Sequence, residues 1–218
     1  MKRVLVTGGT GQVGQALSRQ LHDQRDNFIF PTRSELDLLS ETSMVNLIRE
    51  TSPDLVVNLA AYTAVDRAED EPELCAAINA TAPAILARET ERLGVPLLHV
   101  STDYVFSGDL DRPYREDDPT GPINIYGQTK LEGERAIAAK NPAHVIIRAS
   151  WIVSAYRNNF IKTMLKLAAD RDTLRVIDDQ IGGPTSADDL ALALLTIINR
   201  HQSQRGLTSG IFHFSNQG

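Results

Sequence analysis

Hydrophobic residues along this chain fall into short apolar runs that alternate with longer stretches in which they recur every three or four residues. Short continuous runs are typical of strands buried on both faces, and the longer spacing is typical of amphipathic helices. Strands are predicted at Val4–Thr7, Phe28–Phe30, Leu55–Leu59, Leu97–Val100, Val145–Arg148, Leu174–Ile177 and Ile211–Phe214. Helices are predicted through Val13, Leu17 and Leu21, through Met44, Leu47 and Ile48, and over 73–93, 126–140, 159–169 and 187–201.

This alternation predicts an α/β protein built on a Rossmann-like, doubly wound parallel sheet with helices on both faces. Residues 1–150 hold the regular part of the pattern and are predicted to form one domain, interrupted by a long loop at 107–124 that is rich in Gly, Pro and Asp. The pattern loosens after residue 150. Residues 151–218 are therefore predicted to be a partial, smaller region interleaved with the last strands.

Composition narrows the classes of function and partner. The net charge of −6 gives no basic surface for nucleic acid or anionic membrane, and no apolar segment approaches the ~18 residues of a membrane span. Cys75 is the single cysteine, which excludes an internal disulfide and favours a reducing, cytoplasmic location. The five histidines show no ligand spacing, so no catalytic metal is expected.

The segment TGGTGQVG, residues 7–14, follows the first predicted strand and opens the first predicted helix. Glycines in that context allow a tight turn and let a pyrophosphate approach the backbone, while the helix N-terminus offers unpaired N–H groups. The segment predicts dinucleotide binding through Gly8, Gly11 and Gly14. At the end of the second strand, Arg33 suits a 2′-phosphate and favours NADPH, whereas Glu35 and Asp37 leave NADH open.

Tyr126 and Lys130 stand four residues apart in a predicted helix, the only such pair in the chain. Residues at that spacing share one helix face, with Cβ atoms roughly 5–6 Å apart. An ammonium beside the phenol would lower the pKa of the phenol and let Tyr126 exchange a proton with a substrate oxygen. An exposed helix face on which the two residues meet by chance is the simpler alternative.

Ligands of doubly wound sheets bind beyond the carboxyl ends of the strands. Three segments leave strands there: NLAAYTAVD at 58–66, STDYVFSG at 101–108 and RASWIVSA at 148–155. They bring small residues, the hydroxyls of Ser101 and Thr102, and Trp151. Each could serve only as a turn cap or a packed side chain, but together with Tyr126 and Lys130 they indicate a catalytic edge.

TGGTGQVG, STDYVFSG and YGQTK in this order resemble the extended short-chain dehydrogenase/reductases. Within that group, NLAAYTAVDRAE, IYGQTKLEGE, SWIV, NNFIKTM and DQIGGPT are similar to the dTDP-4-dehydrorhamnose reductase family over essentially the whole chain. The resemblance implies reduction of the 4-keto group of dTDP-6-deoxy-L-lyxo-4-hexulose to dTDP-L-rhamnose with NADPH or NADH. It implies that residues 151–218 form part of a substrate-binding region. It also implies a dTDP-linked nucleotide sugar as partner, with a homodimer left open.

The resemblance also implies a role for each matching residue. Tyr126 would supply the proton, Lys130 would lower its pKa and bind the nicotinamide ribose, Thr102 would donate to the reacting oxygen, and Asn79 would brace the site. The implied catalytic residues are Thr102, Tyr126 and Lys130. The implied cofactor-binding residues are Gly8, Gly11, Gln12, Val13, Gly14, Arg33, Asp37, Leu38, Ala60, Ala61, Tyr62, Asn79, Tyr126 and Lys130. The implied substrate-binding residues are Thr63, Val65, Thr102, Asp103, Tyr104 and Trp151.

Two departures from the family pattern bear on activity. Val153, Ser154 and Ala155 stand where an aromatic residue and a glycine are common, and family members continue for several dozen residues past position 218. We therefore expect a chain that binds cofactor well and turns over substrate poorly. Two alternatives stay open: a nucleotide-sugar epimerase or dehydratase with tightly held NAD, and a non-catalytic NADP-binding subunit like the regulatory β subunit of methionine adenosyltransferase.

Overall fold

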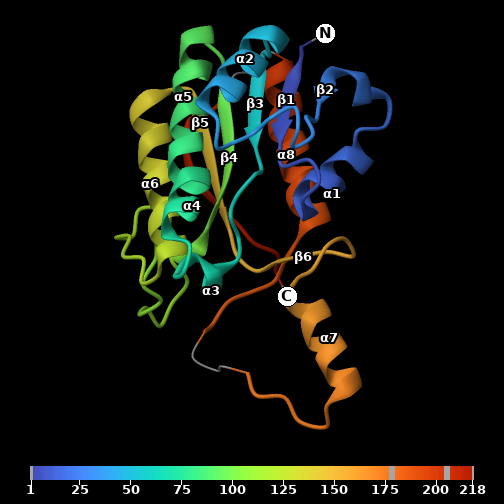
Figure 1. Cartoon of the computed structure of the whole chain (residues 1–218), viewed down its shortest axis with the longest axis vertical. Helices are drawn as coiled ribbons and strands as arrows, with labels where there is room; N and C mark the ends of the chain where they lie inside the picture. The colour runs from blue at the N-terminus through green and yellow to red at the C-terminus, as the bar shows by residue number, and fades with distance from the viewer. Residues whose placement is uncertain (1, 177–179, 204–206, 218) are drawn as a thin grey trace.

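The computed structural model describes residues 2–176, 180–203 and 207–217, and its centre is a six-stranded parallel sheet (Figure 1). The strand order is β2-β1-β3-β4-β5-β8. The strands are β1 (Val4–Thr7), β2 (Phe28–Ile29), β3 (Leu55–Asn58), β4 (Leu97–Thr102), β5 (His144–Ala149) and β8 (Gly210–Phe214). Because all pairs are parallel, the carboxyl ends of the strands meet at one edge.

Helices cover both faces of the sheet. They are α1 (Gln12–Gln20), α2 (Glu41–Thr51), α3 (Val65–Ala68), α4 (Pro72–Ala76), α5 (Ala82–Leu93), α6 (Ile125–Lys140), α7 (Phe160–Asp170) and α8 (Ala187–Gln202). Short 3₁₀ segments lie at His22–Asn27 and Asp103–Val105, and a π-helical turn at Ala77–Thr81. Within the described residues, no helix is long and apolar enough to cross a membrane.

The core has two layers because successive residues of a buried strand point to opposite faces. Val4, Val6 and Val57 pack with α1 and α8 on one face. Leu5 and Val56 pack with α2, α5 and α6 on the other. The doubly wound parallel sheet predicted from the sequence is confirmed, and α8 with β8 completes it from the region after residue 150.

Three local differences separate the structure from the sequence prediction. The expected strand at Leu174–Ile177 is wrong for residues 174–176, which are irregular, while Ile177 lies outside the described residues. Val176 is 51% exposed there and has no neighbouring strand to pair with among the described residues. The helix predicted over 73–93 is interrupted by the π-helical turn at Ala77–Thr81. The two-stranded sheet of β6 (Ile152–Val153) and β7 (Thr185–Ser186) was not predicted.

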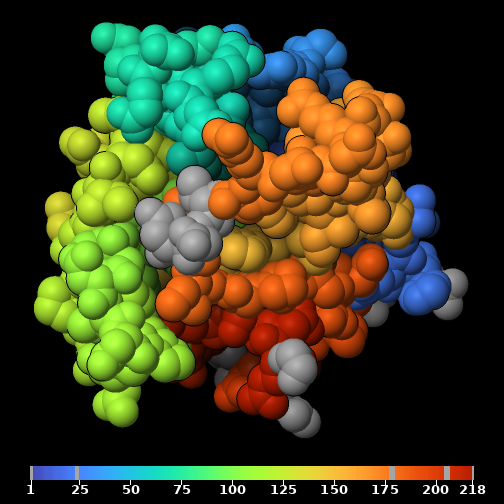
Figure 2. Space-filling view, turned by 90° about the horizontal axis from the view of Figure 1, so that it is seen from below, coloured from blue at the N-terminus to red at the C-terminus, as the bar shows by residue number. Residues whose placement is uncertain are grey.

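Residues 151–176 extend beyond the carboxyl edge of the main sheet. Helix α7 stands away from the helix layers in Figure 1. None of its residues, Phe160–Asp170, is buried. Viewed onto this end of the molecule, Figure 2 shows α7 (orange), the loop before α6 (green) and α3 (teal) grouped around the segment of β6. These segments form the surface over the strand ends.

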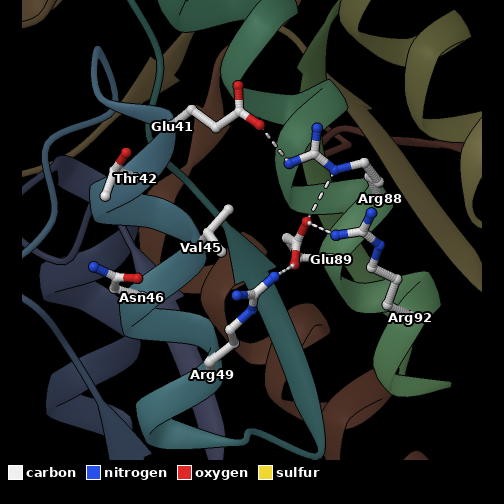
Figure 3. A pocket seen from close by; sticks show the side chains of 8 residues that line it. All are labelled: Glu41, Thr42, Val45, Asn46, Arg49, Arg88, Glu89 and Arg92. Atoms are coloured by element: carbon white, nitrogen blue, oxygen red, sulfur yellow. Dashed lines mark hydrogen bonds and ion pairs between the residues drawn. The ribbon is translucent and has the colours of Figure 1, made fainter.

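A separate hollow lies between α2 and α5 and is lined by an ion cluster (Figure 3). Glu89, which is 3% exposed, accepts from Arg88 Nε and from Arg92 Nη1, each at 2.9 Å, and Arg49 lies 3.8 Å away. Arg88 also bridges to Glu41 at 2.8 Å. These charges tie α2 to α5, and no residue that the sequence predicted for the site lines this hollow.

Candidate active site

The glycine-rich turn after β1 leaves no room for a side chain at Gly8 or Gly14. Gly8 has a φ of +71°, and its carbonyl accepts from Gly11 N at 2.9 Å. A Cβ on Gly14 would lie 2.5 Å from Gly8 O and 2.6 Å from Gly9 Cα. Gly11 precedes α1 and offers no side-chain cap, so the first backbone N–H groups of α1 are left for an anion. The turn fits the pyrophosphate of a dinucleotide.

Gln12 and Val13, both predicted cofactor-binding residues, use their side chains within the protein. Val13 is buried in the core beneath the turn. Gln12 Nε2 donates to Ile152 O at 3.2 Å, and its Oε1 accepts from Ser154 Oγ at 2.7 Å and Asn159 Nδ2 at 3.0 Å. The side chain of Gln12 therefore ties the turn to the segment before α7, which leaves its backbone for a cofactor.

The turn after β2 presents Arg33. Glu35 closes this turn by accepting from Thr32 N at 2.7 Å and Thr32 Oγ1 at 2.8 Å, and these bonds lower the pKa of Glu35. Arg33 and Asp37 are exposed, with Asp37 Oδ1 accepting from Leu39 N at 2.9 Å. Leu38 packs against the apolar layer of α2. The Glu35 carboxylate is thus engaged in the turn, while the Arg33 guanidinium faces solvent.

The segment after β3 is held by Asn79. Asn79 is 1% exposed; its Oδ1 accepts from Tyr62 N at 2.9 Å and its Nδ2 donates to Tyr62 O at 3.0 Å. The π-helical turn that carries Asn79 aims its amide at this backbone. The Tyr62 hydroxyl turns to Glu71 Oε2 at 2.7 Å, and this bond raises the pKa of Tyr62. Ala60 and Ala61, both partly buried, lie beside the glycine turn, where a Cβ on Gly8 would be 2.6 Å from Ala60 N.

Tyr126 lies in the first turn of α6, which Asn124 caps by accepting from Gly127 N at 2.7 Å. Gly127 packs so closely on the Tyr104 backbone that a Cβ would collide with Tyr104 O. This contact sets the Tyr104 ring edge-on against the Tyr126 ring, with centroids 5.5 Å apart. Tyr126 is partly accessible to solvent, yet the protein around its hydroxyl raises the pKa of the phenol to about 12.

Thr102 and Asp103 end β4 beside Tyr126. Thr102, 5% exposed, donates from Oγ1 to Asp103 Oδ1 at 3.1 Å and accepts from Tyr104 N at 3.2 Å. The Thr102 hydroxyl partly opposes the rise in the Tyr126 pKa. Burial raises the pKa of Asp103, and its hydrogen bond with Thr102 opposes that rise.

Lys130 lies one turn deeper in α6 and is 1% exposed. Its Nζ donates to Val100 O at 2.8 Å and lies 3.2 Å from His99 Nε2. Burial lowers the pKa of Lys130 to about 8. The prediction that the Lys130 ammonium lowers the Tyr126 pKa is wrong for this structure, because burial dominates at the phenol and the Lys130 amine is bonded to β4 instead.

The predicted substrate residues lie on the segments that surround this edge. Thr63 is exposed, and Val65 begins α3. Trp151 is 37% exposed, has a φ of +42°, and lies 5.9 Å from the Phe160 ring. Tyr104 OH reaches Gln180 Oε1 at 3.5 Å. Hydrogen bonding thus joins Tyr104 to the loop before β7, whereas Thr63 and Trp151 are presented at the surface.

Sequence reasoning missed His99 and Asn58, which lie behind the site. Both are fully buried polar residues in β4 and β3, and Asn58 Nδ2 is 2.9 Å from His99 Nδ1. A polar residue inside an apolar strand run such as LLHV was the signal that could have drawn attention to His99.

Comparison with known proteins adds independent information. The family described as RmlD substrate binding domain matches residues 1–218. The chain is 46% identical over 217 residues to dTDP-4-dehydrorhamnose reductase of Sinorhizobium fredii, covering 99% of this chain and 73% of that protein. The crystal structure of the dTDP-4-dehydrorhamnose reductase of Clostridium acetobutylicum superposes with a TM-score of 0.91 at 37% identity, covering 99% of this chain and 75% of that one.

A second solved structure carries a cofactor. The dTDP-4-dehydrorhamnose reductase of Bacillus anthracis in complex with NADP superposes with a TM-score of 0.91 at 36% identity. The superposition covers 100% of this chain and 75% of the B. anthracis chain, so the relatives are longer than this chain. The match to the family over all 218 residues, together with the shared fold, shows that this chain belongs to the RmlD substrate binding domain family.

Proposed function

We propose that this chain performs NAD(P)H-dependent reduction of the 4-keto group of dTDP-6-deoxy-L-lyxo-4-hexulose to dTDP-L-rhamnose, as part of polysaccharide biosynthesis. One observation carries the proposal: Thr102 ends β4 and Tyr126 begins α6 at the carboxyl edge of the sheet, both contacting Tyr104, with Lys130 one turn further along α6 and bonded to Val100 O of β4. The names of the S. fredii and B. anthracis relatives support the substrate and the cofactor.

The cofactor would be held by groups from three strand ends. The backbone of Gly11 to Gly14 would bind the pyrophosphate, and Arg33 would face a 2′-phosphate, which favours NADPH. Ala60 and Ala61 leave space beside the turn. When bound, NAD(P)H supplies the hydride that reduces the ketone carbon.

Tyr126 is the proton donor in this proposal. With the pKa of its phenol raised to about 12, Tyr126 is protonated at neutral pH and can give its proton to an oxygen that becomes an alkoxide. The Thr102 hydroxyl would donate to the same oxygen and stabilise its developing charge. Lys130, whose Nζ donates to Val100 O at 2.8 Å, would hold the start of α6 against β4 and so keep Tyr126 at the strand end.

The substrate would lie against Thr63, Val65, Asp103, Tyr104 and Trp151. We also propose a cytoplasmic location, in keeping with the free, buried thiol of Cys75. A homodimer is proposed as the assembly to be tested by light scattering.

The test follows NADPH oxidation with the 4-keto sugar nucleotide. We expect Tyr126→Phe to lower the rate at saturating NADPH by roughly 10²–10⁴-fold, the usual contribution of a general acid, with NADPH affinity measured separately by calorimetry. Tyr114→Phe, which removes another phenol outside the site, is the matched control. Equal rates for Tyr126→Phe and the wild type would refute the assignment of the proton donor.

Two rival functions predict different results in the same experiments. An epimerase or dehydratase would purify with NAD that does not exchange and would not consume NADPH in stoichiometric amounts. A non-catalytic subunit would bind NADPH but show no oxidation with the sugar nucleotide, either in this chain or in one extended to the length of its relatives.

A further inference from the structure

A continuous line of buried polar side chains crosses the sheet beneath the site. Thr7 Oγ1 lies 2.5 Å from Asn58 Oδ1, Asn58 Nδ2 lies 2.9 Å from His99 Nδ1, and His99 Nε2 lies 3.2 Å from Lys130 Nζ. None of the four residues is more than 2% exposed. The strand register puts them in line, since Thr7 pairs with Asn58 and Asn58 pairs with His99.

The ring of His99 has one proton to share between two partners. Burial and the nearby Lys130 push the pKa of His99 well below its usual range, so the imidazole is neutral. A neutral imidazole donates from one nitrogen and accepts at the other. If Asn58 Nδ2 donates to Nδ1, the ring proton is on Nε2 and must be accepted by a neutral Lys130 amine.

A charged Lys130 requires the opposite arrangement. An ammonium has only donors, so Nε2 must accept and the ring proton moves to Nδ1. Asn58 must then present its carbonyl oxygen to His99 and its amide nitrogen to Thr7. This exchange turns an amide whose two ends have nearly the same shape, so it needs no change in packing.

We propose that His99 is a positioning residue for Lys130, and that the proton on Lys130 is coupled through the His99 tautomer to the orientation of the Asn58 amide. The catalytic meaning of this coupling rests on the function proposed above for Lys130, whereas the coupling itself does not. Lys130 Nζ donates to Val100 O at 2.8 Å in either arrangement, so His99 is the partner that changes.

Other ionisable groups face Lys130 from the elements packed around it. Glu134 on α6 and Cys75 on α4 favour the charged amine, and Tyr126 lies one turn away on α6. Glu134 is paired with buried Arg148 at 2.7 Å. Within the described residues, none of these groups forms a hydrogen bond with His99. His99 is therefore the group that links the charge state of Lys130 to the orientation of the Asn58 amide.

The far end of the line touches the proposed cofactor edge. Thr7 Oγ1 also accepts from Ala60 N at 3.4 Å, beside the glycine turn. When the Asn58 amide nitrogen faces Thr7, it donates to Thr7 Oγ1, and the Thr7 hydroxyl no longer donates its proton to Asn58. The charge state of Lys130 is thereby transmitted to the backbone where the dinucleotide is proposed to bind.

Nuclear magnetic resonance on the chain without cofactor or substrate tests the coupling. Long-range ¹H–¹⁵N correlations report the His99 tautomer, and ¹³C-labelled lysine reports the Lys130 charge, with Lys130→Met assigning the signal. From about pH 6 to about pH 10, we expect His99 to change from the Nδ1–H to the Nε2–H tautomer with the same midpoint as Lys130. A constant His99 tautomer while Lys130 titrates, or a charged His99 at about pH 6, would overturn the proposal.

Variants of His99 separate positioning from simple packing. His99→Gln keeps an acceptor near Lys130, whereas His99→Leu removes it. We expect the Lys130 midpoint to fall by at least about one pH unit in His99→Leu and by less than about half a unit in His99→Gln. Equal midpoints in the wild type and both variants would overturn the proposal, and the wild-type titration decides it if His99→Leu does not fold. None of these readouts depends on turnover.

Discussion

Replacing Lys130 by methionine tests how the buried amine of Lys130 changes the stability of the fold with pH. Lys130 is 1% exposed, and burial lowers its pKa from 10.5 to about 8. Methionine has a similar length and no charge, so Lys130→Met removes the titrating group while filling most of its volume. The variant leaves Val100 O and His99 without their partner, a loss of about 1–3 kcal/mol that sets the offset between the two proteins below about pH 8.

The pH dependence of stability isolates the titration. The folded-state pKa of Lys130 lies below the unfolded value, so between about pH 8 and pH 10.5 the unfolded chain binds more protons than the folded one. Stability of the wild type relative to Lys130→Met therefore rises with pH through that window, by about 1.4 kcal/mol per pH unit at most. The full difference is about 3 kcal/mol, and it is constant below about pH 8.

Urea unfolding of both proteins at fixed ionic strength, at several values from about pH 7 to about pH 10, measures this difference. Tyr126 has a pKa raised from 10.0 to about 12, so its own loss of stability begins near pH 10, at the upper end of the measured range, and occurs in both proteins. Lys140→Met, at the exposed end of the same helix, controls for removal of a lysine. A flat difference between wild type and Lys130→Met across this range would refute the reasoning.

Three further predictions follow from close contacts and charges. Gly14→Ala should weaken NADPH binding at least tenfold by calorimetry, because its Cβ would lie 2.5 Å from Gly8 O, while Gly121→Ala, whose nearest neighbour is 3.8 Å away, should not. Glu134→Gln should destabilise the fold by about 3–5 kcal/mol in urea unfolding by leaving Arg148 unpaired and buried, and adding Arg148→Met should recover most of that loss. Arg33→Ala should reduce NADPH affinity more than NADH affinity; equal losses would contradict a 2′-phosphate contact.

Local patterns were sufficient for most of the fold. Short apolar runs identified the six strands of the main sheet, because strands buried on both faces need continuous hydrophobic sequence. The same reasoning failed at Leu174 to Val176, since a strand also needs a neighbour to complete its hydrogen bonds, and periodicity carries no information about neighbours. The β6–β7 pair was missed for the converse reason: its two-residue strands are too short to show a pattern.

By itself, the sequence determined the order of the strands and helices along the chain, the glycine-rich turn at Gly8 to Gly14, and the placement of Tyr126 and Lys130 on one helix. Only the tertiary structure decided what surrounds those groups. The pKa of Tyr126 rises instead of falling because desolvation depends on everything packed around the hydroxyl, and Lys130 bonds to His99 because the sheet register brings β4 beneath α6. Spacing along a helix sets which residues can meet, whereas burial and register across the sheet decide which of them do.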